Sequence, residues 1–220
     1  MTDDLDFGLS RILDSWARGQ IHTCMPGTVT AFTDRGTPQV SVRPGFKRLK
    51  EGADVAEDLP IIENVPVVYP GGSDYMIVFD LPVDSPVLLV FTERSIGSWM
   101  QQGGSADPAL DHMFDLSDAI AIPGLIPHPS ELPTDVIEDG IEIRNRDGDV
   151  YIKIDGSVIT VDNSDATIEL DANKITIDSG DDGVITLDSD VISIENSSGD
   201  IELKSNGQVA INGTNLTVDA

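Results

Sequence analysis

The sequence predicts an all-β protein, because its last third repeats a strand-sized unit and its middle carries further short strand patterns. From residue 141 onward, an apolar, a polar and a second apolar residue are followed by a few Asp, Asn, Ser or Gly residues, and the unit then begins again. Alternation with period two in β-branched residues predicts strands with one buried face, and the spacers predict frequent reversals of the chain. The units are Ile141–Ile143, Ile152–Ile154, Ile159–Val161, Ile168–Leu170, Ile175–Ile177, Ile185–Leu187, Ile192–Ile194, Ile201–Leu203, Val209–Ile211 and Leu216–Val218.

The aliphatic stripe of these units predicts a rod. No single unit can cover its own stripe, so the stripe is buried only when coils stack or when several chains wrap around a common axis. We therefore expect a β-helix or β-prism over residues 141–220. Both tryptophans lie ahead of these repeats, so the core of the rod is expected to be aliphatic.

The front of the chain predicts a short helix followed by a small barrel. Residues 1–20 place apolar side chains at helical spacing, and this stripe packs either on its own domain or on a neighbouring protein. Short strand patterns then follow within residues 21–126, and about five strands in such a length favour an OB-like barrel. The expected strands are 27–32, 39–44, 66–69, 75–79, 86–92 and 119–122, with no helix expected among them. Residues 127–140 are rich in proline and are expected to form a linker to the rod.

The charge of the chain excludes several classes of partner. Thirteen basic and thirty-nine acidic residues give a formal net charge of −26, which disfavours nucleic acid and anionic lipid. The single cysteine, Cys24, excludes an intrachain disulfide. The first residues lack the basic start and apolar run of a signal peptide, so we expect synthesis in a cytoplasm without Sec export.

The order of motifs in the barrel region resembles a known family. The motifs are Met25-Pro26-Gly27-Thr28-Val29, Gln39-Val40-Ser41-Val42-Arg43-Pro44, Val65-Pro66-Val67-Val68-Tyr69-Pro70-Gly71-Gly72, Pro86-Val87-Leu88-Leu89-Val90-Phe91-Thr92-Glu93-Arg94 and the stretch from Asp111 to Leu125. Over about residues 20–126 their order is similar to the N-terminal OB-fold domain of the central spike of contractile-tailed bacteriophages, the baseplate assembly protein V group. The acidic repeats that follow are similar to the β-helical needle of that family.

This resemblance implies a homotrimeric virion protein of the tail baseplate. Its barrels would attach to the baseplate hub, and three intertwined tails would form a needle that pierces the host outer membrane mechanically during tail contraction. The residues expected at the trimer axis are Ile143, Ile154, Val161, Ile168, Leu170, Ile175, Ile177, Ile185, Leu187, Ile192, Ile194, Ile201, Leu203, Val209 and Ile211.

The sequence departs from the family at the end of the needle. Members often carry a His-any-His iron site at the apex, whereas the histidines here are His22, His112 and His128, all ahead of the repeats. An iron-bearing tip is then absent or supplied by a separate protein, such as one of the PAAR-repeat type. We expect no metal and no cofactor in this chain.

Catalysis is not expected from the acidic pairs of the rod. A pair of catalytic carboxylates needs a cleft that separates their pKa values, and a solvated turn surface offers none. The calcium-binding nonapeptide and the helix-loop-helix calcium loop are both missing. His112 lies near Asp111, Asp115 and Ser117, but no nucleophile-elbow pattern accompanies them. Two other classes stay open: a trimeric tail-fibre or adhesin shaft, and a single-chain β-solenoid enzyme.

Overall fold

The chain is described by a computed structural model that divides it into two compact units, Met1–Pro129 and Ser130–Ala220. The description covers residues 21–213 except 35, 50–53, 73, 129–131, 133–135 and 181–182. The helix expected over residues 1–20 and the last expected repeat, Leu216–Val218, lie outside the described residues. Each unit is described by itself.

The first unit is built on a five-stranded sheet. Its strands are β1 (Cys24–Asp34), β2 (Gln39–Pro44), β5 (Ile62–Pro66), β6 (Pro86–Phe91) and β7 (Ala119–Pro123), in the order β5-β2-β1-β6-β7. All neighbours in this order are antiparallel. The two edges of the sheet approach each other directly after β5, where Val67 forms a parallel bridge with Ala121 and the Val68 amide donates to the Ala121 carbonyl over 3.0 Å. The sheet therefore curls until β5 and β7 meet.

The core of this unit follows from strand alternation. In β2 and β6, every second side chain is buried, as expected for strands with one face inside. Val29, Val40, Val87, Leu89 and Ala121 are fully buried together. Gly27 of β1 is also buried in this core, because a Cβ there would lie 2.6 Å from Val42 Cγ1 and 3.1 Å from Leu89 Cδ1. The close approach of these two side chains to the β1 backbone requires glycine at this position.

Shorter elements lie between the barrel strands. A two-residue ladder joins β3 (Lys47–Arg48) to β4 (Glu57–Asp58), and Lys47 Nζ lies 3.1 Å from Asp58 Oδ1. Between β6 and β7 the chain forms the helix α2 (Gly97–Gln102) and the 3-10 turn η1 (Leu116–Asp118). Sequence periodicity did not predict α2, since six residues are too few to show an apolar stripe.

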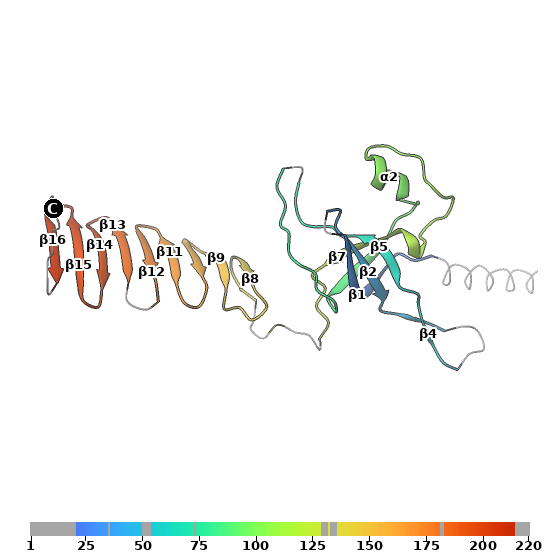
Figure 1. Ribbon diagram of the computed structural model, residues 1–220, viewed down its shortest axis with the longest axis horizontal. Coiled ribbons are helices and arrows are strands. Elements are labelled where there is room, and N and C mark those ends of the chain that lie inside the picture. The colour runs from blue at the N-terminus through green and yellow to red at the C-terminus, as the bar shows by residue number, and fades with distance from the viewer. Residues whose placement is uncertain are drawn as a thin grey trace, which may run out of the picture. The chain divides into compact units, whose positions relative to one another are not determined.

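The second unit is one sheet in which strand order follows chain order. Its strands are β8 (Ile141–Arg144), β9 (Tyr151–Asp155), β10 (Val158–Asp162), β11 (Thr167–Asp171), β12 (Lys174–Asp178), β13 (Val184–Asp188), β14 (Val191–Asn196), β15 (Gly199–Lys204) and β16 (Val209–Gly213). The nine strands pair antiparallel, each with its neighbours along the chain. Figure 1 shows them following one another along the sheet.

The structure confirms that the described chain consists almost entirely of β-strands. It does not confirm the more specific predictions made within that fold class. The expected strand at 75–79 is absent, because this segment forms only an isolated bridge between Gly71 and Met76. The β-helix and its intertwining are not confirmed: in the described chain, residues 141–213 form a meander whose consecutive strands hydrogen-bond to one another.

An aliphatic face as the candidate functional surface

Two unbroken rows of aliphatic side chains cross the whole repeat sheet. The pairing places one apolar residue of each repeat directly opposite one of the next repeat, so that a row runs through all nine strands. The first row is Ile143, Ile152, Val161, Ile168, Ile177, Ile185, Ile194, Ile201 and Ile211. The second row is Ile141, Ile154, Ile159, Leu170, Ile175, Leu187, Ile192, Leu203 and Val209. Residues two apart in a strand share a face, so both rows lie on one side of the sheet. We call this side the aliphatic face.

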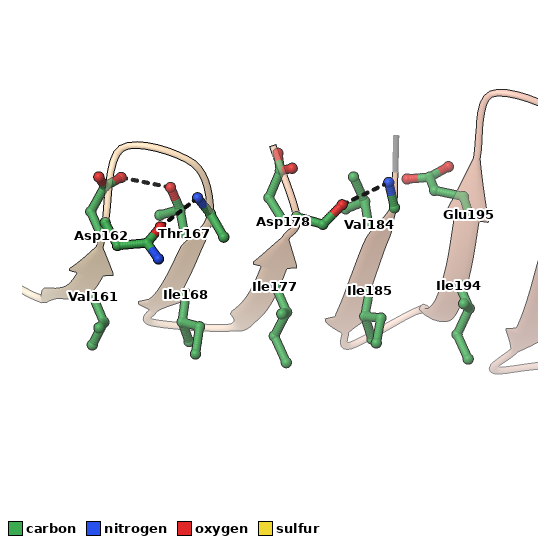
Figure 2. Close-up of a pocket in the computed structure, with 14 residues that line it drawn as sticks. Val161, Asp162, Thr167, Ile168, Ile177, Asp178, Val184, Ile185, Ile194 and Glu195 are labelled. Atoms are coloured by element: carbon green, nitrogen blue, oxygen red, sulfur yellow. Dashed lines mark hydrogen bonds between the residues drawn. The ribbon is translucent and has the colours of Figure 1, made fainter. Parts of the chain in front are cut away.

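The aliphatic face is uncovered in the single chain. All of its side chains are exposed except Ile185, which is half-buried, and the exposed fraction runs from 37% at Leu170 to 64% at Ile141. Figure 2 shows Val161, Ile168, Ile177, Ile185 and Ile194 in a row, pointing away from the side taken by Asp162 and Thr167. A groove of about 560 Å³ lies along this row. Contiguous apolar surface of this extent marks an interaction site in a folded protein.

The opposite side of the sheet is polar and less exposed along its middle. A central row runs through Glu142, Lys153, Thr160, Glu169, Thr176, Thr186, Ser193, Glu202 and Ala210. Ser193 in this row is only 8% exposed. Side chains two positions away on the same strands flank this row on the same side of the sheet. We call this side the polar face.

Ion pairs along the strands tie the few cations of this unit to the polar face. Lys153 Nζ lies 2.9 Å from Asp155 Oδ2, and Lys204 Nζ lies 3.0 Å from Glu202 Oε2. The hydrogen bond and the charge of Asp155 raise the pKa of Lys153 above its ordinary value. Each pair joins residues two apart in one strand, which confirms that they share a face.

The acidic turns of the repeats bind their own backbone. Asp162 Oδ1 accepts from the Ser164 amide over 2.8 Å, and Asp162 Oδ2 accepts from the Thr167 hydroxyl over 2.7 Å. The Thr167 hydrogen bond, followed by the Ser164 hydrogen bond, lowers the pKa of the Asp162 carboxyl. Hydrogen bonds from Ser189 and Asp190 lower the pKa of Asp188 in the same way. These carboxylates have a structural use as turn formers, which is the usual role of Asp and Asn in short loops.

The fifteen residues predicted for the trimer axis all lie on the aliphatic face, divided between its two rows. The structure brings them together in one surface, although one chain alone does not test what covers it. Ile141, Ile152 and Ile159 belong to the same face and were missing from the prediction. Their signal was already in the sequence, since each is the first apolar residue of a repeat whose second apolar residue was predicted.

In the first unit, the polar residues around His112 do not form a catalytic triad and instead hold the backbone between β6 and β7. His112 Nδ1 lies 3.0 Å from Asp118 Oδ2, but the contact is not aligned as a hydrogen bond. Asp118 is 5% exposed, and its Oδ1 accepts from the Ile96 amide over 3.2 Å. The Ser117 hydroxyl donates to Asp115 Oδ1 over 2.7 Å, and this hydrogen bond lowers the pKa of Asp115. The arrangement fixes the segment between β6 and β7.

A metal-binding cluster and a membrane-spanning helix are both absent from the part of the chain that the structure describes. This part contains no group of three or more His, Cys, Asp or Glu residues placed to hold a metal ion. Its helices are too short or too polar to span a membrane.

Residues 25–124 match the family model described as the phage protein Gp138 N-terminal domain. The match covers the five-stranded sheet from β1 to β7 and ends before the repeat sheet. It supports a phage structural protein of the spike or baseplate kind. No curated protein matches the chain.

Proposed function

We propose that the chain is the central spike of a contractile phage tail baseplate and that it acts as a homotrimer. One observation carries the proposal: a phage structural domain at residues 25–124 is followed by a nine-stranded sheet whose whole aliphatic face is uncovered. In this proposal the first unit attaches to the baseplate hub and the repeat sheets of three chains form the needle. Its place in the particle is the centre of the tail baseplate.

The strand order of the first unit supports an OB fold. A five-stranded Greek-key barrel with antiparallel neighbours is the pattern of that fold. Here the order is β5-β2-β1-β6-β7, and the parallel bridge between Val67 and Ala121 brings β5 next to β7. This arrangement and the position of the match together favour the resemblance to the baseplate assembly protein V group.

The repeat sheet has the physical properties that a needle requires. Burial of an aliphatic side chain contributes about 1.5–3 kcal/mol, and the aliphatic face offers two such side chains from each of nine strands. The conformational entropy of ordering the chain offsets most of this gain, so folding of the sheet and assembly of the trimer are expected to be one event. Continuous backbone pairing along the sheet gives stiffness, and a stiff rod transmits force without any bond chemistry.

The surface charge suits passage through an envelope. From Asp135 onward the sequence has twenty acidic and five basic residues, so a needle built from it carries a strongly negative outer surface. Like-charge repulsion reduces adhesion to phosphate-rich lipid and to nucleic acid. The host outer membrane is then a mechanical barrier for this protein and not a bound partner. A separate tip protein at the end of the needle is part of the same proposal.

Electron microscopy of virions with gold-labelled antibodies against residues 21–128 tests this function. We expect label at the centre of the baseplate, and we expect three chains per particle of the purified protein by native mass spectrometry. Label on peripheral fibres would instead identify a tail-fibre shaft, and a folded monomer with buried aliphatic rows would identify a β-solenoid. Either result would overturn the spike assignment.

A further inference from the structure

The loop between β5 and β6 carries a run of exposed apolar residues. Residues 75–79 read Tyr-Met-Ile-Val-Phe and hold no charge, in a chain whose formal net charge is −26. Tyr75 is 87% exposed, and Met76 and Val78 are each 61% exposed. Figure 1 shows this loop extending away from the five-stranded sheet. Contiguous apolar surface of this kind marks a contact with another molecule.

One side of this segment keeps unpaired backbone groups. The Tyr75 carbonyl and the Ile77 amide are hydrogen-bonded to residues 70–72, over 2.8 Å in both cases. Backbone groups alternate in direction along an extended segment, so those of Met76 and Val78 point to the opposite side. No hydrogen bond joins the backbone of Met76 or Val78 to another residue that the structure describes. The segment is therefore an open strand edge, which proteins normally protect or cover.

We propose that residues 75–79 bind the baseplate hub protein by β-strand addition, in which they pair with the edge of a sheet in that protein. This inference rests on the proposed function, since it names the segment by which the first unit attaches to the hub. The outward backbone groups of Met76 and Val78 form the new ladder, and the apolar side chains give the contact its specificity.

The exposure of both sides of the segment requires a strand as the occupant. Side chains alternate along an extended chain, so Met76 and Val78 lie on one side and Tyr75 and Ile77 on the other. Ile77 is 53% exposed, so the barrel covers neither side. A flat apolar surface would cover one side only and leave the outward backbone unpaired. An added strand pairs with the backbone and extends the apolar surface on both sides.

Charge disfavours a second copy of this chain as the occupant. Asp74 and Asp80 flank the five apolar residues. Two copies that paired antiparallel about Ile77 would place Asp74 of one copy directly opposite Asp80 of the other, at both ends of the pair. Like charges directly opposite each other destabilise a strand pair. The segment instead fits a partner strand that carries Lys or Arg at its ends.

Proline substitutions in the full chain test the role of the outward amide. Val78→Pro removes the amide hydrogen and keeps an apolar side chain, and proline is tolerated on a strand edge where the N–H faces solvent. Val83→Pro is the matched control, because Val83 is 58% exposed and lies at the second position of the turn that the Ser85 amide closes on the Pro82 carbonyl over 3.1 Å. Proline is favoured at that position of a turn.

Incorporation into particles is the measurement. Each variant is supplied to a phage that lacks a functional gene for this chain, and the amount of the chain in purified tails is measured by quantitative mass spectrometry. We expect about tenfold less Val78→Pro than wild type, because a carbonyl of the partner strand loses its donor. We expect Val83→Pro to reach the wild-type level. Wild-type levels of Val78→Pro, or equal losses of both variants, would overturn strand addition.

Hydrogen exchange of the wild-type chain gives a second readout that does not depend on a variant. Peptides covering residues 74–80 are compared between the purified free protein and assembled tails. We expect the amides of Met76 and Val78 to exchange rapidly in the free protein and slowly in tails. Unchanged exchange in tails would overturn the proposal. Slow exchange already in the free protein would show that further copies of this chain cover the edge, and would overturn the assignment to the hub.

The outcomes separate this inference from the proposed function. Absence of the wild-type chain from the centre of the baseplate overturns both proposals. Presence of the chain at the centre of the baseplate, with Val78→Pro incorporated at the wild-type level, overturns strand addition and leaves the spike assignment standing.

Discussion

Ile177 of β12 lies directly opposite Ile185 of β13 on the aliphatic face, while its neighbour Thr176 lies opposite Thr186 on the polar face. The two pairs are adjacent in the same two strands and lie on opposite sides of the sheet. This difference makes position 177 and position 176 a matched pair for testing which side is buried in the assembled protein.

Substitution Ile177→Asp is expected to abolish assembly. It places a carboxylate in the middle of the first aliphatic row, and burial of an unpaired charge costs several kcal/mol for each copy. Thr176→Asp adds the same charge to the polar face and should leave the native mass at three chains. Native mass spectrometry and thermal melting of both variants measure the effect. Equal behaviour of the two variants would contradict a buried aliphatic face.

Substitution Gly27→Ala is expected to destabilise the first unit by about 1–3 kcal/mol. The added Cβ would lie 2.6 Å from Val42 Cγ1 and 3.1 Å from Leu89 Cδ1, inside the core of the barrel. Gly72→Ala is the control, because a Cβ there meets nothing within 4 Å. Hydrogen exchange of the β1 and β6 amides in the full chain should be faster in Gly27→Ala and unchanged in Gly72→Ala. Unchanged exchange in both would show that the core relaxes around the methyl group.

The sequence predicted the repeat sheet better than it predicted the barrel loops, and the reason is local. Ile175, Thr176 and Ile177 alternate strictly, and the Asp178 carboxylate that follows them accepts from the Gly180 amide of its own turn. Strand, face and turn are therefore all encoded within this one repeat. The segment 75–79 also has an apolar pattern typical of a strand, but no strand of the barrel pairs with it beyond the bridge of Met76 to Gly71. Pairing partners are distant in sequence and leave no local signal.

The same reasoning explains which part of the candidate surface could be predicted. The identity of the aliphatic residues follows from their spacing, whereas their register across nine strands depends on the lengths of the turns between strands. A two-residue turn such as Gly156–Ser157 aligns Ile154 with Ile159, and the longer turns keep the same alignment. The intertwining of chains stays a prediction, because alternation alone does not say whether the neighbouring strand belongs to the same chain.

Substitution Asp118→Ala is expected to loosen the segment between β6 and β7. It removes the acceptor of the Ile96 amide and the charge beside His112 in a buried position, and loss of a buried hydrogen-bond partner costs about 1–3 kcal/mol. Asp118→Asn keeps an acceptor for the amide and should have a smaller effect. Limited proteolysis of the full chain within residues 92–118 measures the opening. Equal cleavage rates in wild type and Asp118→Ala would show that the carboxylate does not anchor the segment.

The Asp162 carboxylate is expected to make the repeat sheet sensitive to acid. Its pKa in the folded state is lowered from 3.8 by the hydrogen bonds from Thr167 and Ser164, so the folded state favours the ionised form. A group with a lowered folded pKa stabilises the fold above its unfolded pKa, and this contribution is lost as pH falls through the folded value. The difference in melting temperature between wild type and Asp162→Asn should therefore be largest near pH 7 and should narrow below pH 3.8. Asp165→Asn is the control, because it removes the same charge from the same turn and so corrects for the general relief of charge repulsion at acid pH. If its difference in melting temperature from wild type narrows in the same way as that of Asp162→Asn, a specific role of the Asp162 hydrogen bonds is contradicted.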